Sequence, residues 1–264
     1  MARFCPLFSG SSGNSYYIGN SEAGILVDAG RSAKQLSEAL LRFGIEPKAV
    51  KAVFVTHEHS DHIQGLRVFA AKHQCTVYSS LGTLEALNDA QILDGRFQAE
   101  EIGSGGVECA GMLIRPFHTS HDSAESIGYT IHTSDDRKVC ISTDLGYISE
   151  EVSRELSGSD LVVIESNHDV GMLKNGGYPY YLKRRILSDR GHLSNEVCAA
   201  ILPQLVRDGT TRVVLAHLSR ENNTPELAYQ TALCSLKMAG FTSGVDFLLS
   251  VAPRENTTYG TMIF

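Results

Sequence analysis

The chain has 264 residues, of which 42% are hydrophobic and 20% are charged, and its formal net charge is −7 at pH 7. A chain of this length and composition can bury a core without disulfide bonds, so it is not a small disulfide scaffold. The acidic balance also argues against a passive nucleic-acid coat, which is usually basic, although bound divalent cations would bring positive charge to the site that needs it.

The six cysteines are scattered along the chain without a Cys-x-x-Cys pair. We therefore expect reduced, buried thiols in a cytoplasmic protein. The sequence has no signal-peptide pattern, and no stretch approaches the roughly 18 apolar residues of a membrane span. We expect no membrane contact and no obligate protein partner.

In the first half of the chain, short apolar runs between Gly and Ser residues predict strands. These runs are 3–8, 15–19, 24–28, 51–56 and 76–78. Apolar residues at helical spacing predict helices over 32–44, which Ser32 can cap and Gly44 can end, and over 63–72.

The second half repeats this mixture. Strands are predicted over 112–116, 127–132, 138–142, 161–164, 212–216 and 247–251. Helices are predicted after Ser149 and over 181–188, 194–206 and 225–238. Because strands alternate with crossover helices and no long linker intervenes, we expect a single α/β domain over residues 1–264, with two packed sheets and helices outside.

The strongest chemical signal is the run His57-Glu-His59-Ser-Asp61-His62, directly after a predicted strand. In an extended segment alternate residues project to the same side, so His57, His59 and Asp61 can converge. Imidazole and carboxylate ligands suit zinc, iron or manganese. The ordinary alternative is a solvated polar loop, which three histidines and an aspartate within six residues make a poor explanation.

Three further polar residues follow apolar strands: Asp28, Asp144 and His217. Open α/β sheets place their sites at such strand ends. Each residue alone could be a helix cap or a turn former, but together they predict more metal ligands. His118 and His121 compete for one further ligand position, and spacing alone does not separate them.

The candidate residues occur along the chain in the order Asp28, the His57–His62 run, His121, Asp144 and His217. This ordered series resembles the five motifs of the metallo-β-lactamase superfamily. More narrowly, several runs look like the WalJ/YycJ-type hydrolases of that superfamily. They are 8–15, 120–122, 165–169, 191–195 and 217–223, and the resemblance extends from about residue 3 to the C-terminus.

The resemblance implies a four-layer αββα sandwich, with two mixed β-sheets flanked by helices, and two divalent metal ions of zinc, manganese or iron. The implied ligands are His57, His59 and His121 for one ion, and Asp61, His62 and His217 for the other, with Asp144 bridging. Asp28 would support the ligands. Because 120–122 resembles the third motif, His121 is preferred over His118.

Two such ions would activate water for hydrolysis, and Asp61 could orient that water and accept its proton. His192 resembles a histidine that ribonuclease Z-like relatives place near the site, with an acidic partner that matches Glu165. A phosphodiester leaving group needs a proton, which His192 could donate. Alternatively, His192 only precedes the helix predicted over 194–206.

Three other segments could contact a nucleic-acid backbone. Lys183 and Arg184 belong to the densest basic run, which could equally be a solvated helix face. Ser11 and Asn14 lie in a Gly/Ser loop that could present donors to a phosphate, or form a tight hairpin. Asn222 lies in the run 217–223 and is taken as a further substrate contact.

The WalJ/YycJ resemblance implies an exonuclease acting on double-stranded DNA. The larger nucleases of the superfamily carry an inserted domain after the fourth motif, and the 72 residues between Asp144 and His217 leave no room for it. The rival enzyme is a thioester or lactone hydrolase with the same metals. A binding protein that kept the fold without catalysis is a further alternative, which the complete ligand series disfavours.

Overall fold

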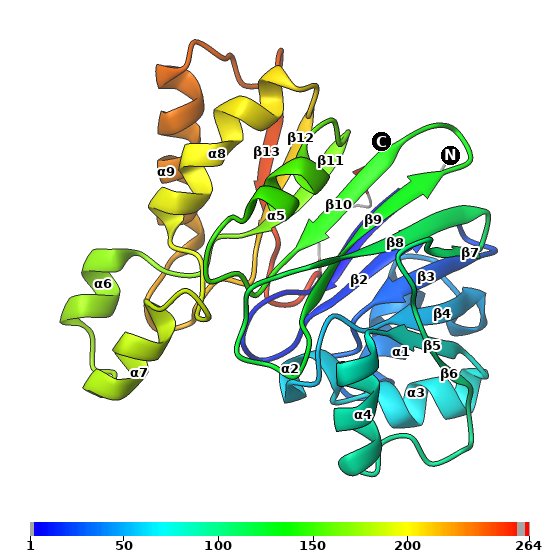
Figure 1. The fold of residues 1–264 in the computed structure, drawn as a ribbon. Helices are drawn as coiled ribbons and strands as arrows, with labels where there is room; N and C mark the ends of the chain where they lie inside the picture. Colours follow the sequence, from blue (N-terminus) through cyan, green and yellow to red (C-terminus); the bar gives the residue numbers. More distant parts are fainter. Residues whose placement is uncertain (1–2, 258–261, 264) are drawn as a thin grey trace. The chain divides into compact units, whose positions relative to one another are not determined.

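The computed structural model describes residues 3–257 and 262–263 (Figure 1). The chain divides into two compact units. Unit 1 contains the described residues within 1–116, 123–136 and 253–264, and unit 2 contains residues 117–122 and 137–252. The expectation of a single domain stays a prediction.

Unit 1 contains a mixed seven-stranded sheet. Its strands, in spatial order, are β14 (Met262–Ile263), β1 (Arg3–Phe8), β2 (Ser15–Gly19), β3 (Gly24–Val27), β4 (Val50–Phe54), β5 (Thr76–Ser79) and β6 (Ala99–Glu101). β14, β1, β2 and β3 pair antiparallel, whereas β3 to β6 pair parallel. The strands predicted over 3–8 and 15–19 are confirmed, and those over 24–28, 51–56 and 76–78 are confirmed with shifted ends. The sequence did not predict β6 or β14.

The helices of unit 1 are α1 (Ala33–Arg42), the 3-10 helix η1 (Pro47–Ala49), α2 (Ser60–Ile63), α3 (Leu66–His73) and α4 (Leu81–Asp89). The Ser32 side chain accepts a hydrogen bond from the backbone N–H of Gln35, which caps α1 as predicted. Leu36 and Leu40 of α1 join the buried core with Phe69 of α3.

The helix predicted over 63–72 is confirmed as α3, which begins three residues later. Two helices, α2 and α3, occupy this stretch, and Gly65 lies between them. A Cβ at Gly65 would lie 2.0 Å from the carbonyl oxygen of Arg31, and its N–H donates to the carbonyl of Ala29 at 2.8 Å. The interruption follows from this close approach, which fixes the end of the histidine run against the segment after β3.

Three further strands begin in unit 1: β7 (Val107–Cys109), β8 (Met112–His118) and β9 (Ile127–Thr133). β7 and β8 form an antiparallel hairpin whose turn residues Ala110 and Gly111 both have positive φ, 52° and 72°. β8 extends to Phe117 and His118, which belong to unit 2. Strands β8 and β9 were predicted with shorter ends, whereas β7 and α4 were not predicted.

Unit 2 contains four parallel strands in the order β10 (Lys138–Ser142), β11 (Leu161–Glu165), β12 (Arg212–Ala216) and β13 (Leu248–Val251). Its helices are α5 (Glu150–Leu156), α6 (Val170–Asn175), α7 (Tyr180–Ile186), α8 (Asn195–Arg207) and α9 (Pro225–Met238). The predicted strands 138–142 and 212–216 and the predicted helix 225–238 are confirmed to the residue. Only α6 had no sequence signal.

Parallel pairing decides where the polar residues of unit 2 lie. Val163 of β11 is level with Ile141 of β10 and Val214 of β12, so the three strands end at the same edge. Glu165 is the last residue of β11, Asp144 follows β10, and His217 follows β12. The strands are fully buried apart from their first residues, so this edge is where polar groups can gather.

The thiols largely follow the expectation. Six cysteines are free, and Cys5, Cys75, Cys140 and Cys198 are buried, but Cys109 is partly exposed and Cys234 is exposed. Among the described residues, no helix has both the length and the apolar character needed to cross a bilayer. The cytoplasmic location stays a prediction.

Candidate metal centre

The histidine cluster of unit 1 lies where the chain leaves β4. His57 and His62 are fully buried, and their ring centroids are 4.1 Å apart. The His59 ring lies 4.6 Å from that of His57, and an oxygen of Asp61 lies 3.6 Å from Nε2 of His62. The four predicted ligands therefore converge, because a short extended segment leads directly into α2.

A buried carboxylate orients this cluster. Asp28 Oδ2 lies 2.7 Å from Nδ1 of His62 and accepts a hydrogen bond from it, which leaves Nε2 as the unprotonated nitrogen. Thr56 donates its backbone N–H and its hydroxyl to Asp28, and the hydroxyl oxygen lies 3.0 Å from Nδ1 of His57. Burial raises the pKa of Asp28, against the lowering effects of His62 and Thr56. Asp28 was predicted to support the ligands, and Thr56 was missed although it directly precedes the histidine run.

The Gly/Ser loop is bound to the same cluster. Nδ2 of Asn14 lies 3.1 Å from Nε2 of His62, and Asn14 is fully buried. Its backbone N–H donates to the carbonyl of Asp61, and Gly10 donates to its Oδ1. Asn14 thus holds the His62 ring and the Asp61 backbone in place, which is a simpler role for a buried side chain than the substrate contact expected from the sequence. Ser11 is exposed and accessible to a substrate.

Unit 2 gathers its polar cluster from separate segments. The Asp144 Oδ1 lies 3.5 Å from Nδ1 of both His192 and His217, and 3.7 Å from Nε2 of His121. The His121 side chain is 1% exposed, whereas that of His118 is 67% exposed and lies beside Glu151. The structure therefore brings His121 to the cluster and leaves His118 on the surface.

Glu165 connects two histidines of this cluster. Its Oε1 accepts from Nδ1 of His192 at 2.9 Å and from Nδ1 of His217 at 2.8 Å. Its Oε2 accepts the backbone N–H groups of Leu145 and Leu193. Burial alone would raise the pKa of Glu165, but the two histidines outweigh it and lower the pKa to about 2. The expected pairing of Glu165 with His192 is present, and its contact with His217 was missed.

Backbone conformation marks the predicted strand-end residues. Asp28, Asp144 and His217 have φ values of 62°, 59° and 54°, in the left-handed region that non-glycine residues avoid. Such a conformation costs about 1–3 kcal/mol per residue and persists where the surroundings impose it, often at functional sites. No sequence pattern predicts this left-handed conformation, so it is seen only in the structure.

Four histidines of the two clusters hydrogen-bond through Nδ1, and this arrangement suits metal binding through Nε2. The Nδ1 atoms of four have an acceptor: Asp28 for His62, Glu165 for both His192 and His217, and the carbonyl of Gly191 for His121 at 3.1 Å. Metal-binding histidines almost always donate their second N–H in this way.

In unit 2, Asp144, Glu165, His192 and His217 each offer an atom within 4.8 Å of the others. Because Oε1 of Glu165 already accepts from two histidines, we interpret Glu165 as a support for ligands.

The remaining predicted substrate residues lie in unit 2. Arg184 is exposed on α7, and Nζ of Lys183 donates to the carbonyl of Lys174. Asn222 is 1% exposed, and its backbone carbonyl accepts from Asp169. Arg184 is therefore accessible to a substrate, whereas Asn222 is buried within the unit. Asn167 was missed: it donates to the carbonyl of His217 at 2.9 Å.

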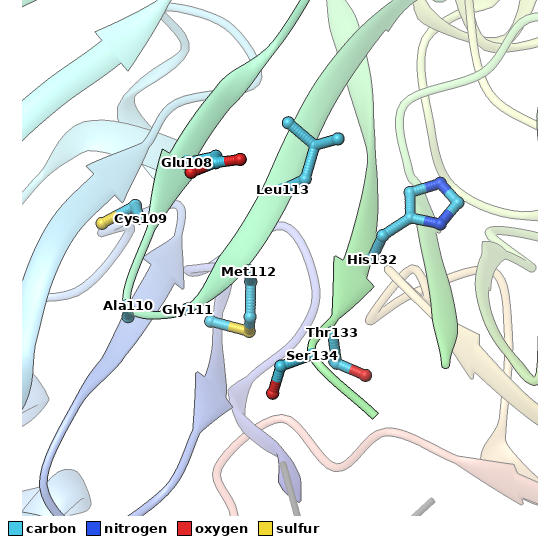
Figure 2. A pocket seen from close by; sticks show the side chains of 9 residues that line it. All are labelled: Glu108, Cys109, Ala110, Gly111, Met112, Leu113, His132, Thr133 and Ser134. Carbon is cyan, nitrogen blue, oxygen red and sulfur yellow. The ribbon is translucent and has the colours of Figure 1, made fainter. Parts of the chain in front are cut away.

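A pocket at the β7–β8 hairpin of unit 1 does not contain a comparable cluster (Figure 2). Its lining includes Cys109, Met112 and His132. The Cys109 and His132 side chains point away from each other in Figure 2, so they do not converge on one ligand.

Comparison with known proteins identifies the family. A model described as the beta-lactamase superfamily domain matches residues 24–218. The chain belongs to this superfamily. Over 248 residues it is 40% identical to exodeoxyribonuclease YycJ of Bacillus anthracis, covering 92% of each chain. Over 249 residues it is 38% identical to exodeoxyribonuclease WalJ of Streptococcus pneumoniae, covering 93% of this chain and 92% of that one. The expected resemblance is confirmed, and the chain is a WalJ/YycJ-type hydrolase of the metallo-β-lactamase fold.

Solved structures agree on the fold. Zinc-bound PqqB from Methylobacterium extorquens matches with a TM-score of 0.74 over 100% of both chains, at 15% sequence identity. The expected fold class is confirmed as two mixed β-sheets flanked by helices. The histidine and aspartate groups of this chain are able to bind divalent metal ions, as expected for the family.

Proposed function

We propose that this protein is a metal-dependent exonuclease that hydrolyses phosphodiester bonds in double-stranded DNA. The observation that carries the proposal is the pairing of His192 with Glu165, 2.9 Å apart, beside Asp144. The His192 side chain is 16% exposed, so it remains accessible while its Nδ1 is held. A thioester hydrolase has less need of such a histidine, because a thiolate leaves without protonation more readily than an alkoxide does.

We further propose that two divalent ions, of zinc, manganese or iron, are bound. The ligands would be the seven residues named from the sequence: His57, His59, Asp61, His62, His121, Asp144 and His217. The anchored Nδ1 atoms described above support this assignment, since they fix which nitrogen of each ring is offered. When bound, such ions supply Lewis acidity that lowers the pKa of water towards about 7 and stabilises a developing oxyanion.

The remaining steps belong to the chain itself. Asp61 is partly exposed at the start of α2 and could orient the attacking water and accept its proton. His192 would donate a proton to the leaving oxygen through Nε2, because Nδ1 is held by Glu165. The carboxylate of Glu165 fixes the orientation of the ring for this step.

The substrate assignment rests on the relatives. YycJ and WalJ are exodeoxyribonucleases by name and match more than nine-tenths of this chain. The exposed residues Ser11 and Arg184, together with Lys183, are the proposed backbone contacts. Asn14 and Asn222 are buried, so they would affect the substrate only indirectly.

The decisive test compares metal-loaded wild type with His192→Ala on linear duplex DNA. We expect degradation by the wild type, and a rate about 10²- to 10⁴-fold lower for the variant, which is the usual contribution of general acid catalysis. Metal content, measured in the same samples, should be unchanged, and the number of ions per chain is read from that measurement. Thioester hydrolysis by the wild type without any DNA degradation would overturn the proposal.

A further inference from the structure

Two adjacent tyrosines at the start of α7 are largely exposed. Tyr180 and Tyr181 are 76% and 73% exposed, although tyrosine normally buries most of its ring. They belong to residues 170–190, the α6–α7 arm, which stands apart from the other helices of unit 2 in Figure 1. From the sequence, only Lys183 and Arg184 of this arm were given a role, as backbone contacts, and α6 had no sequence signal.

From these side chains we infer that the α6–α7 arm binds unpaired nucleotides at a DNA end, with bases stacked on Tyr180 and Tyr181. The inference rests on the proposed function and names the part of the substrate that the arm would hold. Aromatic rings stack with exposed bases of any sequence, whereas the bases inside a duplex are already stacked on one another. The exposed rings therefore favour a frayed or single-stranded terminus over a continuous duplex.

The charge of the arm complements a nucleic-acid strand. Residues 170–190 contain five basic residues and one acidic residue, in a chain with net charge −7. The Arg184 guanidinium lies 6.0 Å from the centroid of the Tyr180 ring, one helical turn further along α7. A base would therefore stack on the ring face opposite Arg184, and its phosphates would lie near this cation.

The arm is also tied to the segment that carries His121. Nη2 of Arg185 donates to Asp122 at 2.9 Å, and Arg190 donates to the carbonyl of His121 at 3.2 Å. Ser120 donates to the carbonyl of Asp189. Tyr181 lies four residues before Arg185, on the face of α7 that leads to these contacts. A strand held by the tyrosines would therefore be held at a fixed distance from a predicted metal ligand.

The test measures binding of metal-loaded protein to two fluorescent hairpin DNAs, one blunt and one with a single-stranded tail of thymidines. All proteins carry His192→Ala so that the probes survive, and gels confirm that they do. Tyr180→Ala/Tyr181→Ala should weaken binding of the tailed probe about tenfold or more, the scale of losing base stacking, and change blunt-probe binding much less. Tyr180→Phe/Tyr181→Phe should retain binding, since phenylalanine stacks equally well.

Met238→Ala provides a matched control, because Met238 is an 84% exposed apolar residue on α9. Its binding of both probes should equal that of the parent. Equal weakening for both probes, or unchanged binding of the tailed probe, would overturn the inference. Its failure is distinguishable from failure of the proposed function, because DNA degradation by the protein with His192 intact is measured separately. Arg184→Gln should lower the dependence of tailed-probe binding on salt by the equivalent of about one phosphate contact.

Discussion

The two polar clusters of this protein are built in different ways. In unit 1 the His57–His62 run supplies every predicted ligand from one stretch of six residues. In unit 2 the cluster combines single residues from five separate segments: His121, Asp144, Glu165, His192 and His217. The first cluster is therefore set by local backbone geometry, whereas the second depends on strands ending at a common edge and on one carboxylate that holds two rings.

The supporting carboxylates show the same contrast. Asp28 holds the ring of His62, and burial raises its pKa. Glu165 holds His192 and His217 and also accepts two backbone N–H groups, and the two histidines lower its pKa to about 2 despite its burial. A carboxylate that serves two histidines is thus kept charged, whereas for the one that serves a single histidine the cost of burial exceeds the lowering of its pKa by His62 and Thr56.

The largest expected effect separates His121 from His118. We expect His121→Ala to lose bound metal and to reduce DNA hydrolysis to the level of the chelated wild type, because His121 is buried 3.7 Å from Asp144. His118→Ala removes a side chain that is 67% exposed, so activity should stay within about twofold. Metal analysis and nuclease rates check both. Loss of metal in His118→Ala, with retention in His121→Ala, would reverse the assignment.

The second prediction compares the two carboxylates directly. Asp28→Asn and Glu165→Gln should each weaken metal binding by about 10- to 100-fold, as is usual when the partner of a metal-binding histidine is removed. Glu165→Gln should lie at the upper end and also lower kcat, because it releases both His192 and His217. Metal affinities from competition with a chelator check the first effect. A larger loss for Asp28→Asn would contradict the comparison.

The third prediction concerns the backbone under the contiguous cluster. A Cβ at Gly30 would lie 1.7 Å from the carbonyl oxygen of Asp61 and 2.5 Å from the N–H nitrogen of Asn14. Gly30→Ala should therefore cost at least the upper end of the roughly 1–3 kcal/mol that overpacking a core costs. Gly103→Ala is the matched control, since nothing lies within 4 Å of its added Cβ. Urea unfolding measures both, and equal stability of the two variants would show that the close approach is not rigid.

The sequence predicted the contiguous cluster better than the dispersed one for a physical reason. His57, His59 and Asp61 alternate directly after an apolar strand, and both features can be read from neighbouring residues. The contact of Glu165 with His217 joins residues 52 positions apart and depends on parallel pairing of β11 with β12. The pattern of residues along the chain does not predict how these two strands are aligned.

The fold shows the same division. Elements with strong local patterns, such as α9 with its Thr224 cap and Pro225, match the sequence prediction to the residue. The helix expected over 63–72 begins only at Leu66, because Gly65 approaches Arg31, a contact outside the helix itself. The left-handed conformation of Asp144 and His217 likewise has no local sequence signal. Local patterns thus predict which helices and strands form, whereas tertiary contacts determine where those elements begin and end.

The smallest expected effect is a difference in pH dependence between the two carboxylates, in metal-free protein. The pKa of Glu165 is lowered from 4.5 to about 2, so its charged form stabilises the fold above pH 4.5, and this stabilisation is lost as the pH falls towards 2. The pKa of Asp28 is raised above 3.8, so its contribution is greatest below that pH and declines as the pH rises. The wild type should therefore gain stability relative to Glu165→Gln as the pH rises, measured as the difference between their free energies of unfolding. Relative to Asp28→Asn, the same difference should decrease as the pH rises. Urea unfolding at several acidic pH values measures both differences, and parallel curves for the two variants would show that the carboxylates are held in equivalent ways.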